Sequence, residues 1–484
     1  MLLKRFYDTK LAQASFLVGC QRTGEALVVD PNRDLAQYFD AAKAEGLRLT
    51  HVTETHIHAD FLSGSRELAQ RTGARLLLSG EGGPDWQYGF AKEAGATILK
   101  DGDLFRVGNI VVKAMHTPGH TPEHLSFMIT DGAATDRPMG VFTGDFIFVG
   151  DVGRPDLLER AAGMAGTMEA GARDLFRSLR RFRQLPDYLQ LWPAHGAGSA
   201  CGKALGAVPQ TTLGYERFAN WGLATEREDD FVRIVLEGQP EPPAYFAMMK
   251  RMNRDGPRVL GGFPAPVRLP GAALAERLER GAVVVDVRGT AAFAKGHVPG
   301  TINVPLGSSF PTYAGSVLGY DAPVHLLADE ERYPRVGEAL RDLAMIGMDE
   351  VAGCFGGDAF DAWRGAGRGL ETVPQTTAQA LAPRLLQGEV VVIDVRGRSE
   401  WDAGHLAGAI HIPLGAVSGR ADGIPRDRPV VVQCETGSRS AIVASVLRLR
   451  GFRNVENLTG GIAAWRKAGL PVEDVPAENA ATTV

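Results

Sequence analysis

The sequence predicts a multidomain α/β protein, and three observations support this prediction. At 484 residues the chain is too long for one ordinary domain, since domains commonly hold about 100–150 residues. Its second half contains one α/β unit twice. Its first half places histidines and aspartates directly after strand-like apolar runs, where α/β folds commonly carry their chemistry. We therefore expect several cores and at least one site at strand ends.

Composition and charge narrow the classes of function. A hydrophobic fraction of 44% with 23% charged residues is typical of a globular protein and argues against disorder. The formal net charge of -5 gives no broad basic field for nucleic acid or an anionic membrane, so small-molecule chemistry is favoured. The sequence shows neither a signal-peptide pattern nor a long apolar run, so we expect a cytoplasmic protein with no membrane partner. Homo-oligomerisation stays open.

An internal repeat organises the second half of the chain. The segment VVVDVRGTAAFAKGHVPGTINVPLG, from Val283, matches VVIDVRGRSEWDAGHLAGAIHIPLG, from Val391, without a gap. Each copy reads as a buried parallel strand, a short helix, a Gly-His turn and a second strand. We predict two copies of one domain over residues 263–370 and 376–475, followed by a tail at 476–484.

The region before the repeat forms one predicted domain over residues 1–235. A Pro-rich stretch at 236–262 separates this domain from the first copy, and its YFAMMKRMN segment predicts a short helix. This stretch is a linker or covering arm, which either packs between domains or closes over a substrate.

The N-terminal domain contains four motifs rich in metal-ligand residues. THIHADF supplies His56, His58 and Asp60 after one predicted strand. Further along the chain are HTPGHTPEH, with His120 flanked by two other histidines, FTGDF, with Asp145, and LWPAH, with His195. Imidazole nitrogens and carboxylate oxygens at strand ends predict a metal site.

In this order, the four motifs resemble the metallo-β-lactamase superfamily over residues 1–235, which implies an αββα sandwich. In its two-zinc members, such as the glyoxalase II hydrolases, the resemblance assigns His56, His58 and His120 to one metal. Asp60, residue 61 and His195 would hold the other metal, with Asp145 as the bridge. Position 61 is Phe, which has no lone pair, so we expect the second site to lack donors.

The persulfide dioxygenase branch of this superfamily does not need position 61. The resemblance implies one Fe(II) per chain, held by His56, His120 and Asp145, with O2 as co-substrate and positions left open for a persulfide. His58, Asp60 and His195 would then orient ligands and substrate. Spacing alone leaves open an alternative zinc site that uses His58 as a third histidine ligand.

Two more residues near these motifs are candidates for substrate binding. Arg154, in GDVGRPDL, either contacts a substrate carboxylate or fixes its loop through an ion pair. Cys201 follows His195 in a Gly- and Ala-rich loop. This thiol either holds sulfur or simply packs in the core.

The last domain contains a cysteine loop between a strand and a helix, in VVVQCETGSRSAIVASVLRLRG. Cys434 opens the loop, and backbone N–H groups at the helix N-terminus favour an anionic sulfur there. Together with DVRGRSEWDAGHLAGAIHIP, the loop resembles that of the rhodanese sulfurtransferases, with Arg439 steering an anionic donor. Related phosphatases have a loop one residue longer, so this loop suits sulfur better than phosphate. The intervening loop residues, all candidates for substrate binding, are Glu435, Thr436, Gly437 and Ser438.

The first copy of the repeat lacks this nucleophile. Its loop contains Ala328 followed by Asp329, Glu330 and Glu331, and Cys354 lies in a later strand. We expect a degenerate rhodanese domain with a structural role.

The whole chain thus resembles the persulfide dioxygenase–rhodanese fusions of bacterial sulfide detoxification. The resemblance implies oxidation of a low-molecular-weight thiol persulfide to sulfite, and transfer of sulfane sulfur through Cys434 to give thiosulfate. Two alternatives stay open. One is a glyoxalase II-type zinc thioester hydrolase with a fused sulfur-transfer domain, and the other is a non-enzymatic sulfur carrier.

Overall fold

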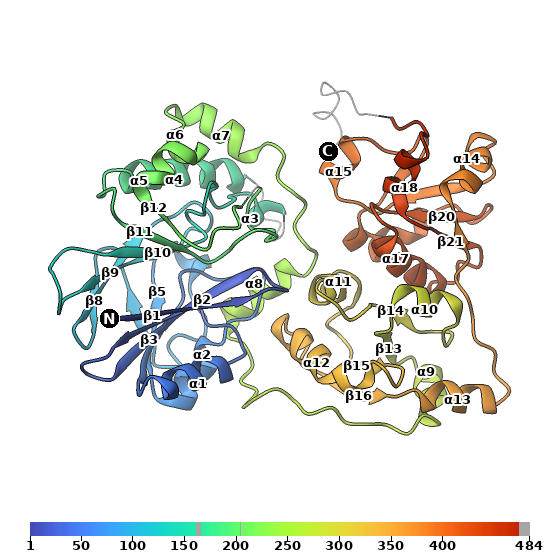
Figure 1. Cartoon of the computed structure of the whole chain (residues 1–484), viewed down its shortest axis with the longest axis horizontal. Helices are drawn as coiled ribbons and strands as arrows, with labels where there is room; N and C mark the ends of the chain where they lie inside the picture. The colour runs from blue at the N-terminus through green and yellow to red at the C-terminus, as the bar shows by residue number, and fades with distance from the viewer. Residues whose placement is uncertain (161–165, 204, 474–484) are drawn as a thin grey trace. The chain divides into compact units, whose positions relative to one another are not determined.

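The computed structural model describes residues 1–160, 166–203 and 205–473, so the tail predicted at 476–484 lies outside the described residues. The chain forms two compact units (Figure 1). The first comprises Met1–Phe263 with Ala344–Gly347, and the second comprises the remaining described residues. No helix among the described residues is both long and apolar enough to cross a membrane.

The first unit is built on two six-stranded sheets, each ordered along the chain. The first sheet is antiparallel from β1 to β3 and parallel from β3 to β6. Its strands are β1 (Leu2–Asp8), β2 (Gln13–Cys20), β3 (Glu25–Val29), β4 (Arg48–Thr53), β5 (Arg75–Ser79) and β6 (Thr97–Leu99). The second has β7 (Leu104–Val107), β8 (Ile110–His116), β9 (Leu125–Asp131), β10 (Gly140–Gly144), β11 (Gln190–Pro193) and β12 (Thr211–Thr212).

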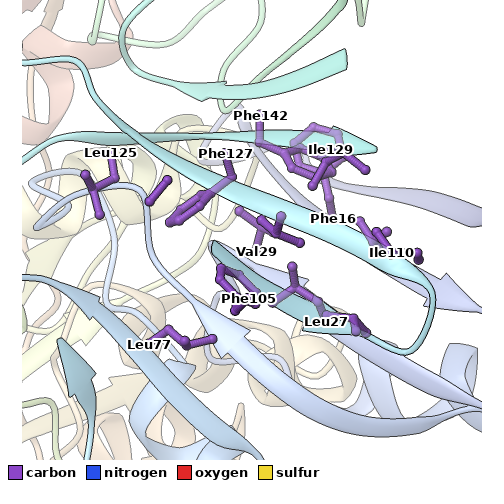
Figure 2. Packing of buried hydrophobic residues seen from close by; sticks show 14 of the residues in the cluster. Phe16, Leu27, Val29, Leu77, Phe105, Ile110, Leu125, Phe127, Ile129 and Phe142 are labelled. Carbon is purple, nitrogen blue, oxygen red and sulfur yellow. The ribbon is translucent and has the colours of Figure 1, made fainter. Parts of the chain in front are cut away.

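A dry core joins the inner faces of these two sheets. Figure 2 shows Phe16, Leu27 and Val29 from the first sheet meeting Phe127 and Phe142 from the second. Alternate residues of each strand face this layer because side chains in a strand alternate between faces. The expected sandwich of two sheets is therefore present, and the α/β fold class is confirmed.

Helices cover the outer face of each sheet. The first sheet packs against α1 (Ala36–Ala44) and α2 (Ser65–Thr72) through a cluster that includes Tyr38 and Leu68. The second packs against α4 (Thr167–Phe182) and its neighbours, through Leu175 and Phe231 among others. The other helices of this unit are α3 (Leu157–Arg160), α5 (Leu213–Ala219), α6 (Trp221–Ala224), α7 (Glu228–Leu236), α8 (Phe246–Asp255) and the short η1 (Pro84–Trp86).

The second unit contains the two copies of the repeat. The first copy has a four-stranded parallel sheet, in the order β14 (Ile302–Asn303), β13 (Val283–Asp286), β15 (Val324–Leu327) and β16 (Val351–Phe355). Its helices are α9 (Ala273–Glu279), α10 (Thr290–Lys295), α11 (Phe310–Val317), η2 (Tyr333–Arg335), α12 (Val336–Met345) and α13 (Asp358–Gly365). Cys354 is buried in β16, as the alignment of the copies predicted.

The second copy repeats this parallel arrangement with one more strand. The order is β17 (Gln375–Thr376), β21 (Val455–Leu458), β20 (Val430–Gln433), β18 (Val391–Asp394) and β19 (Ile410–His411). Its helices are α14 (Ala378–Leu386), α15 (Arg398–Asp402), η3 (Leu414–Ala416), α16 (Val417–Arg420), η4 (Ala421–Gly423), α17 (Ser438–Leu449) and α18 (Gly461–Lys467). Strand β20 ends immediately before Cys434, and α17 begins four residues after it, so this thiol lies in a strand-to-helix loop.

Candidate functional site

Loops at the ends of four strands bring the predicted metal-ligand residues together. The loop after β4 holds His56, His58 and Asp60, and the loop between β8 and β9 holds His120. Asp145 directly follows β10, and His195 lies just after β11. All these residues are buried, with at most 5% of their surface exposed.

His56, His120 and Asp145 form the tightest set of metal-type donors. One ligand atom from each lies within 4.8 Å of the others. The Asp145 Oδ2 atom is 3.5 Å from His120 Nε2 and 3.9 Å from His56 Nε2. This is the triad that the sequence predicted as the iron ligands.

Hydrogen bonds on the far side of each ring set the direction of the lone pairs. His120 Nδ1 donates to the Arg154 carbonyl at 3.0 Å, so its Nε2 lone pair points to Asp145. His56 Nδ1 pairs with Thr55 Oγ1 at 2.9 Å, and that hydroxyl donates to Asp30. His124 Nε2 accepts the Asp145 backbone N–H at 3.1 Å and so holds the carboxylate in place. Such partners are typical of metal-binding histidines.

The donor set fits a bound cation. Both carboxylate oxygens of Asp145 are buried without a hydrogen-bond donor among the described residues, and both oxygens of Asp60 are too. Burial raises the pKa of Asp145 to about 6, despite the opposing influence of His195. Burial also lowers the pKa of His120 to about 3, which keeps the imidazole neutral and able to donate its lone pair. A cation held between these carboxylates and the neutral imidazole of His120 would give both kinds of donor a partner.

His58 is oriented by a carboxylate that the sequence reasoning missed. Its Nε2 atom lies 3.2 Å from Asp30 Oδ1, and its ring centroid lies 4.4 Å from that of Phe61, with the two ring planes tilted by 35°. Burial disfavours protonation, but Asp30 outweighs it and raises the pKa of His58 to about 9. The His58 Nδ1 atom is buried without a partner among the described residues, so the question of a third histidine ligand stays open.

A second group of donors adjoins the first and corrects one step of the sequence reasoning. Asp60, His195 and Cys201 each place a ligand atom within 4.8 Å of the others. His195 Nε2 also lies 3.3 Å from Asp145 Oδ1. We argued that Phe61 leaves a second metal short of donors, but Cys201 supplies the donor that position 61 lacks. A count of donors therefore does not exclude a second ion.

Arg154 forms the ion pair that fixes its loop, one of the two roles expected of it. Its side chain is 0% exposed. Its guanidinium donates to both Asp156 oxygens at 2.8 and 2.7 Å and to the carbonyls of Ala200 and Pro240. These contacts fix the loop after Asp145 and, through the Arg154 carbonyl, orient His120.

The arm at 236–262 belongs to the first unit, where helix α8 supports the metal-binding loop. The Asn253 side chain donates to the carbonyls of His58 and Phe61, both at 2.8 Å, and accepts the Ser63 N–H at 2.9 Å. The predicted helix in this arm is present, and its contacts are those of a packing arm. From the other side, Glu123 accepts the Ile57 N–H at 2.8 Å. Sequence reasoning missed both supports, although Glu123 lies within the HTPEH motif.

The second candidate site is the Cys434 loop. The thiol is 1% exposed, and its Sγ atom accepts the Gly437 N–H at 3.1 Å and lies 3.4 Å from Ser440 Oγ. Gly437 has a φ of 95°, a left-handed conformation that glycine adopts without strain and that turns its N–H toward the sulfur. The loop therefore stabilises negative charge on a sulfur at the α17 N-terminus. Of the remaining loop residues, Thr436 and Ser438 are exposed.

Arg439 forms an ion pair that the sequence did not predict. Its guanidinium donates to both oxygens of Glu400, at 2.7 and 2.6 Å. Burial opposes the charge on Arg439, but the Glu400 carboxylate outweighs this and raises the arginine pKa. The steering of an anionic donor by Arg439 therefore stays a prediction, and sequence spacing could not reveal its Glu400 partner.

The corresponding loop of the first copy carries no nucleophile. Ala328 is fully buried in place of the cysteine, and Glu330 accepts the Gly357 N–H at 3.1 Å. Arg268 joins Glu330 and Asp358 in an exposed ion-pair network. This arrangement is consistent with the structural role expected of the copy.

Comparisons with known proteins recover the same division of the chain. A model of the metallo-beta-lactamase superfamily matches residues 8–195, and a model of the rhodanese-like domain matches residues 271–332 and 377–468. A crystal structure of a metallo-beta-lactamase from Staphylococcus aureus subsp. aureus COL is similar, with a TM-score of 0.68 and 44% identity. The match covers 73% of this chain and 99% of the other.

Curated relatives of the first unit have different activities. The mitochondrial persulfide dioxygenase ETHE1 of Bos taurus is 29% identical over 199 residues, which cover 40% of this chain and 68% of that protein. A hydroxyacylglutathione hydrolase of Methylococcus capsulatus is 32% identical over 173 residues, which cover 36% of this chain and 58% of that protein. The similarities therefore support a metal-dependent enzyme and leave the reaction open.

Proposed function

The chain belongs to the metallo-beta-lactamase superfamily and also carries rhodanese-like domains, and from this premise we propose that it is an iron-dependent persulfide dioxygenase coupled to a sulfurtransferase. The overall oxidation converts R–S–SH, O2 and H2O into R–SH, sulfite and two protons. The single observation that supports this most is the set of His56, His120 and Asp145, in which both Asp145 oxygens lack a hydrogen-bond donor among the described residues. Two histidines and one carboxylate are the donors typical of non-haem Fe(II) oxygenases.

The surrounding residues would keep this set in place. Iron held by His56, His120 and Asp145 would supply the activation of dioxygen. The Arg154 carbonyl and His124 orient His120 and Asp145, respectively. The complete burial of the three ligands would limit access of bulk water, which favours reaction of the bound persulfide with dioxygen over side reactions.

The Cys434 loop would perform the second step. Its thiolate attacks the outer sulfur of a second R–S–SH, the S–S bond breaks, and R–SH leaves with the proton. Sulfite then attacks the outer sulfur of the Cys434 persulfide, which releases thiosulfate and regenerates the cysteine. Linkage of both sites in one chain raises the effective concentration of sulfite at Cys434.

Oxygen consumption by the Fe(II)-loaded full chain with glutathione persulfide tests this proposal. Cys434→Ser is expected to keep oxygen uptake and to change the product from thiosulfate to sulfite, whereas Cys354→Ala should leave the thiosulfate yield unchanged. Loss of oxygen uptake in Cys434→Ser would contradict the assignment of the two steps to separate sites.

A second candidate function is a glyoxalase II-type thioester hydrolase, which the group of Asp60, His195 and Cys201 favours. Two metal ions are the usual requirement of such a reaction in this fold. Hydrolysis of S-lactoylglutathione by the zinc-loaded chain without oxygen, together with no oxygen uptake on persulfide, would establish this function instead.

A further inference from the structure

The charged side chains at the Cys434 loop pair with one another and leave one carboxylate in excess, on the residue that follows the thiol. Arg439 is paired with Glu400 at 2.6 and 2.7 Å. Arg396, which is 1% exposed, donates to Asp394 at 2.8 Å. Each arginine is thus neutralised by an acid of its own, so neither provides an uncompensated charge for an anionic ligand.

Glu435 carries the negative charge that remains after Arg439 and Arg396 are paired with Glu400 and Asp394. It follows Cys434 directly, and its side chain is 40% exposed, whereas its carboxylate lies 3.5 Å from Arg396 Nη1. That distance is longer than a strong charge-assisted hydrogen bond, and Arg396 already has its closer partner in Asp394. The charged residues in contact around the loop are two arginines and three acids, and their net charge is one negative unit. They are Arg396, Arg439, Asp394, Glu400 and Glu435.

We propose that Glu435 determines the class of sulfur donor, by admitting an organic persulfide and repelling thiosulfate. This proposal deepens the proposed function and rests on it for the identity of the reaction. In R–S–SH the outer sulfur carries at most one negative charge, and the other charges of the molecule lie on R. In thiosulfate the same sulfur is bonded directly to a sulfonate group, so a dianion must approach Glu435.

The repulsion acts on both directions of sulfur transfer between Cys434 and a dianion. Sulfite is also repelled, so the Glu435 charge slows transfer to sulfite as well as the uptake of sulfur from thiosulfate. Thiosulfate is diluted into solution after release and must return against the Glu435 charge. The carboxylate therefore limits the reverse reaction, in which thiosulfate would transfer its sulfur to the enzyme.

The test measures formation of the Cys434 persulfide in the full chain by mass spectrometry, without oxygen so that the metal centre is inactive. With thiosulfate as donor, Glu435→Gln should react on the order of tenfold faster than the unmodified chain, from Coulomb's law at a partly exposed site. With glutathione persulfide the two should differ by less than about threefold, and the gain with thiosulfate should shrink in about 1 M salt. Asp427→Asn, which removes an exposed carboxylate of the same domain, should have no effect.

Alkylation of Cys434 tests the charge independently of the proposed reaction. The ratio of its rates with anionic iodoacetate and neutral iodoacetamide reports the local potential, because the thiolate fraction cancels. Glu435→Gln should raise this ratio by about threefold. An unchanged ratio, or an equal gain with both sulfur donors, would overturn the role of Glu435. Absence of oxygen uptake on persulfide would instead refute the proposed dioxygenase and leave the altered alkylation ratio standing.

Discussion

Replacement of Asn253 by alanine should loosen the metal-binding loop by an amount that follows from three hydrogen bonds. The amide donates to the carbonyls of His58 and Phe61 and accepts the N–H of Ser63. Asn253 is 1% exposed, and alanine leaves all three backbone groups without this partner. Each unsatisfied buried polar group costs about 1–3 kcal/mol. Water can enter the space that alanine leaves, so we take about 1 kcal/mol for each of the three groups and expect a total loss of about 3 kcal/mol.

Hydrogen exchange measures this loss where it occurs. Because about 1.4 kcal/mol corresponds to a tenfold change in an equilibrium constant, protection of the Ser63 amide should fall by about a hundredfold. Arg254→Ala, on the exposed side of the same helix, should leave this protection unchanged. If protection in Asn253→Ala stays within threefold of the original chain, helix α8 does not hold the loop and our reasoning fails.

Three further predictions concern the metal, pH and a buried ion pair. Asp145→Asn should weaken iron binding by more than about a hundredfold, since loss of a residue that only hydrogen-bonds to a metal ligand already costs about 10–100-fold in affinity. The control Asp187→Asn, at an exposed site, should retain the metal in elemental analysis. Burial lowers the pKa of His297 to about 4, so the unfolded chain takes up its proton first as pH falls. The contribution of His297 to the free energy of unfolding is therefore fully present above about pH 6.5 and is lost as the pH falls towards 4. The thermal unfolding temperature of His297→Gln should depend less on pH over this range than that of the original chain. Asp394→Ala removes the nearer of the two carboxylates that contact the buried Arg396, which should destabilise the second unit by up to about 3–5 kcal/mol in denaturant titrations.

The sequence was sufficient for the parts of the site that depend on local order. His56, His120 and Asp145 follow strands, and the carboxyl ends of these strands meet, so the metal-type donors converge as predicted. The Cys434 loop could also be predicted from the sequence, because a strand, a short Gly-containing loop and a helix follow one another in the chain.

The remaining features depend on contacts between distant segments. Asn253 reaches the loop of His58 from 195 residues away, and amphipathic patterning in the arm cannot show which side chain makes that contact. The Glu400 partner of Arg439 likewise comes from another helix, α15, so the spacing around Arg439 cannot show it. Asp30 could have been predicted from the sequence, because it directly follows the apolar strand β3, just as Asp145 directly follows β10.

Charge balance favours one metal ion at the first site even though Cys201 offers a second site a third donor. Among the candidate donors that the structure describes here, Asp60 and Asp145 have buried carboxylate oxygens without hydrogen-bond donors, and one divalent ion neutralises both carboxylates. A second divalent ion would leave one net positive charge buried even if Cys201 ionised. Elemental analysis after dialysis from excess zinc or iron should therefore give one ion per chain, both in the original chain and in Cys201→Ala. Two ions in the original chain and one in Cys201→Ala would show that the thiol replaces the missing ligand at Phe61 and that the two-metal hydrolase is the better assignment.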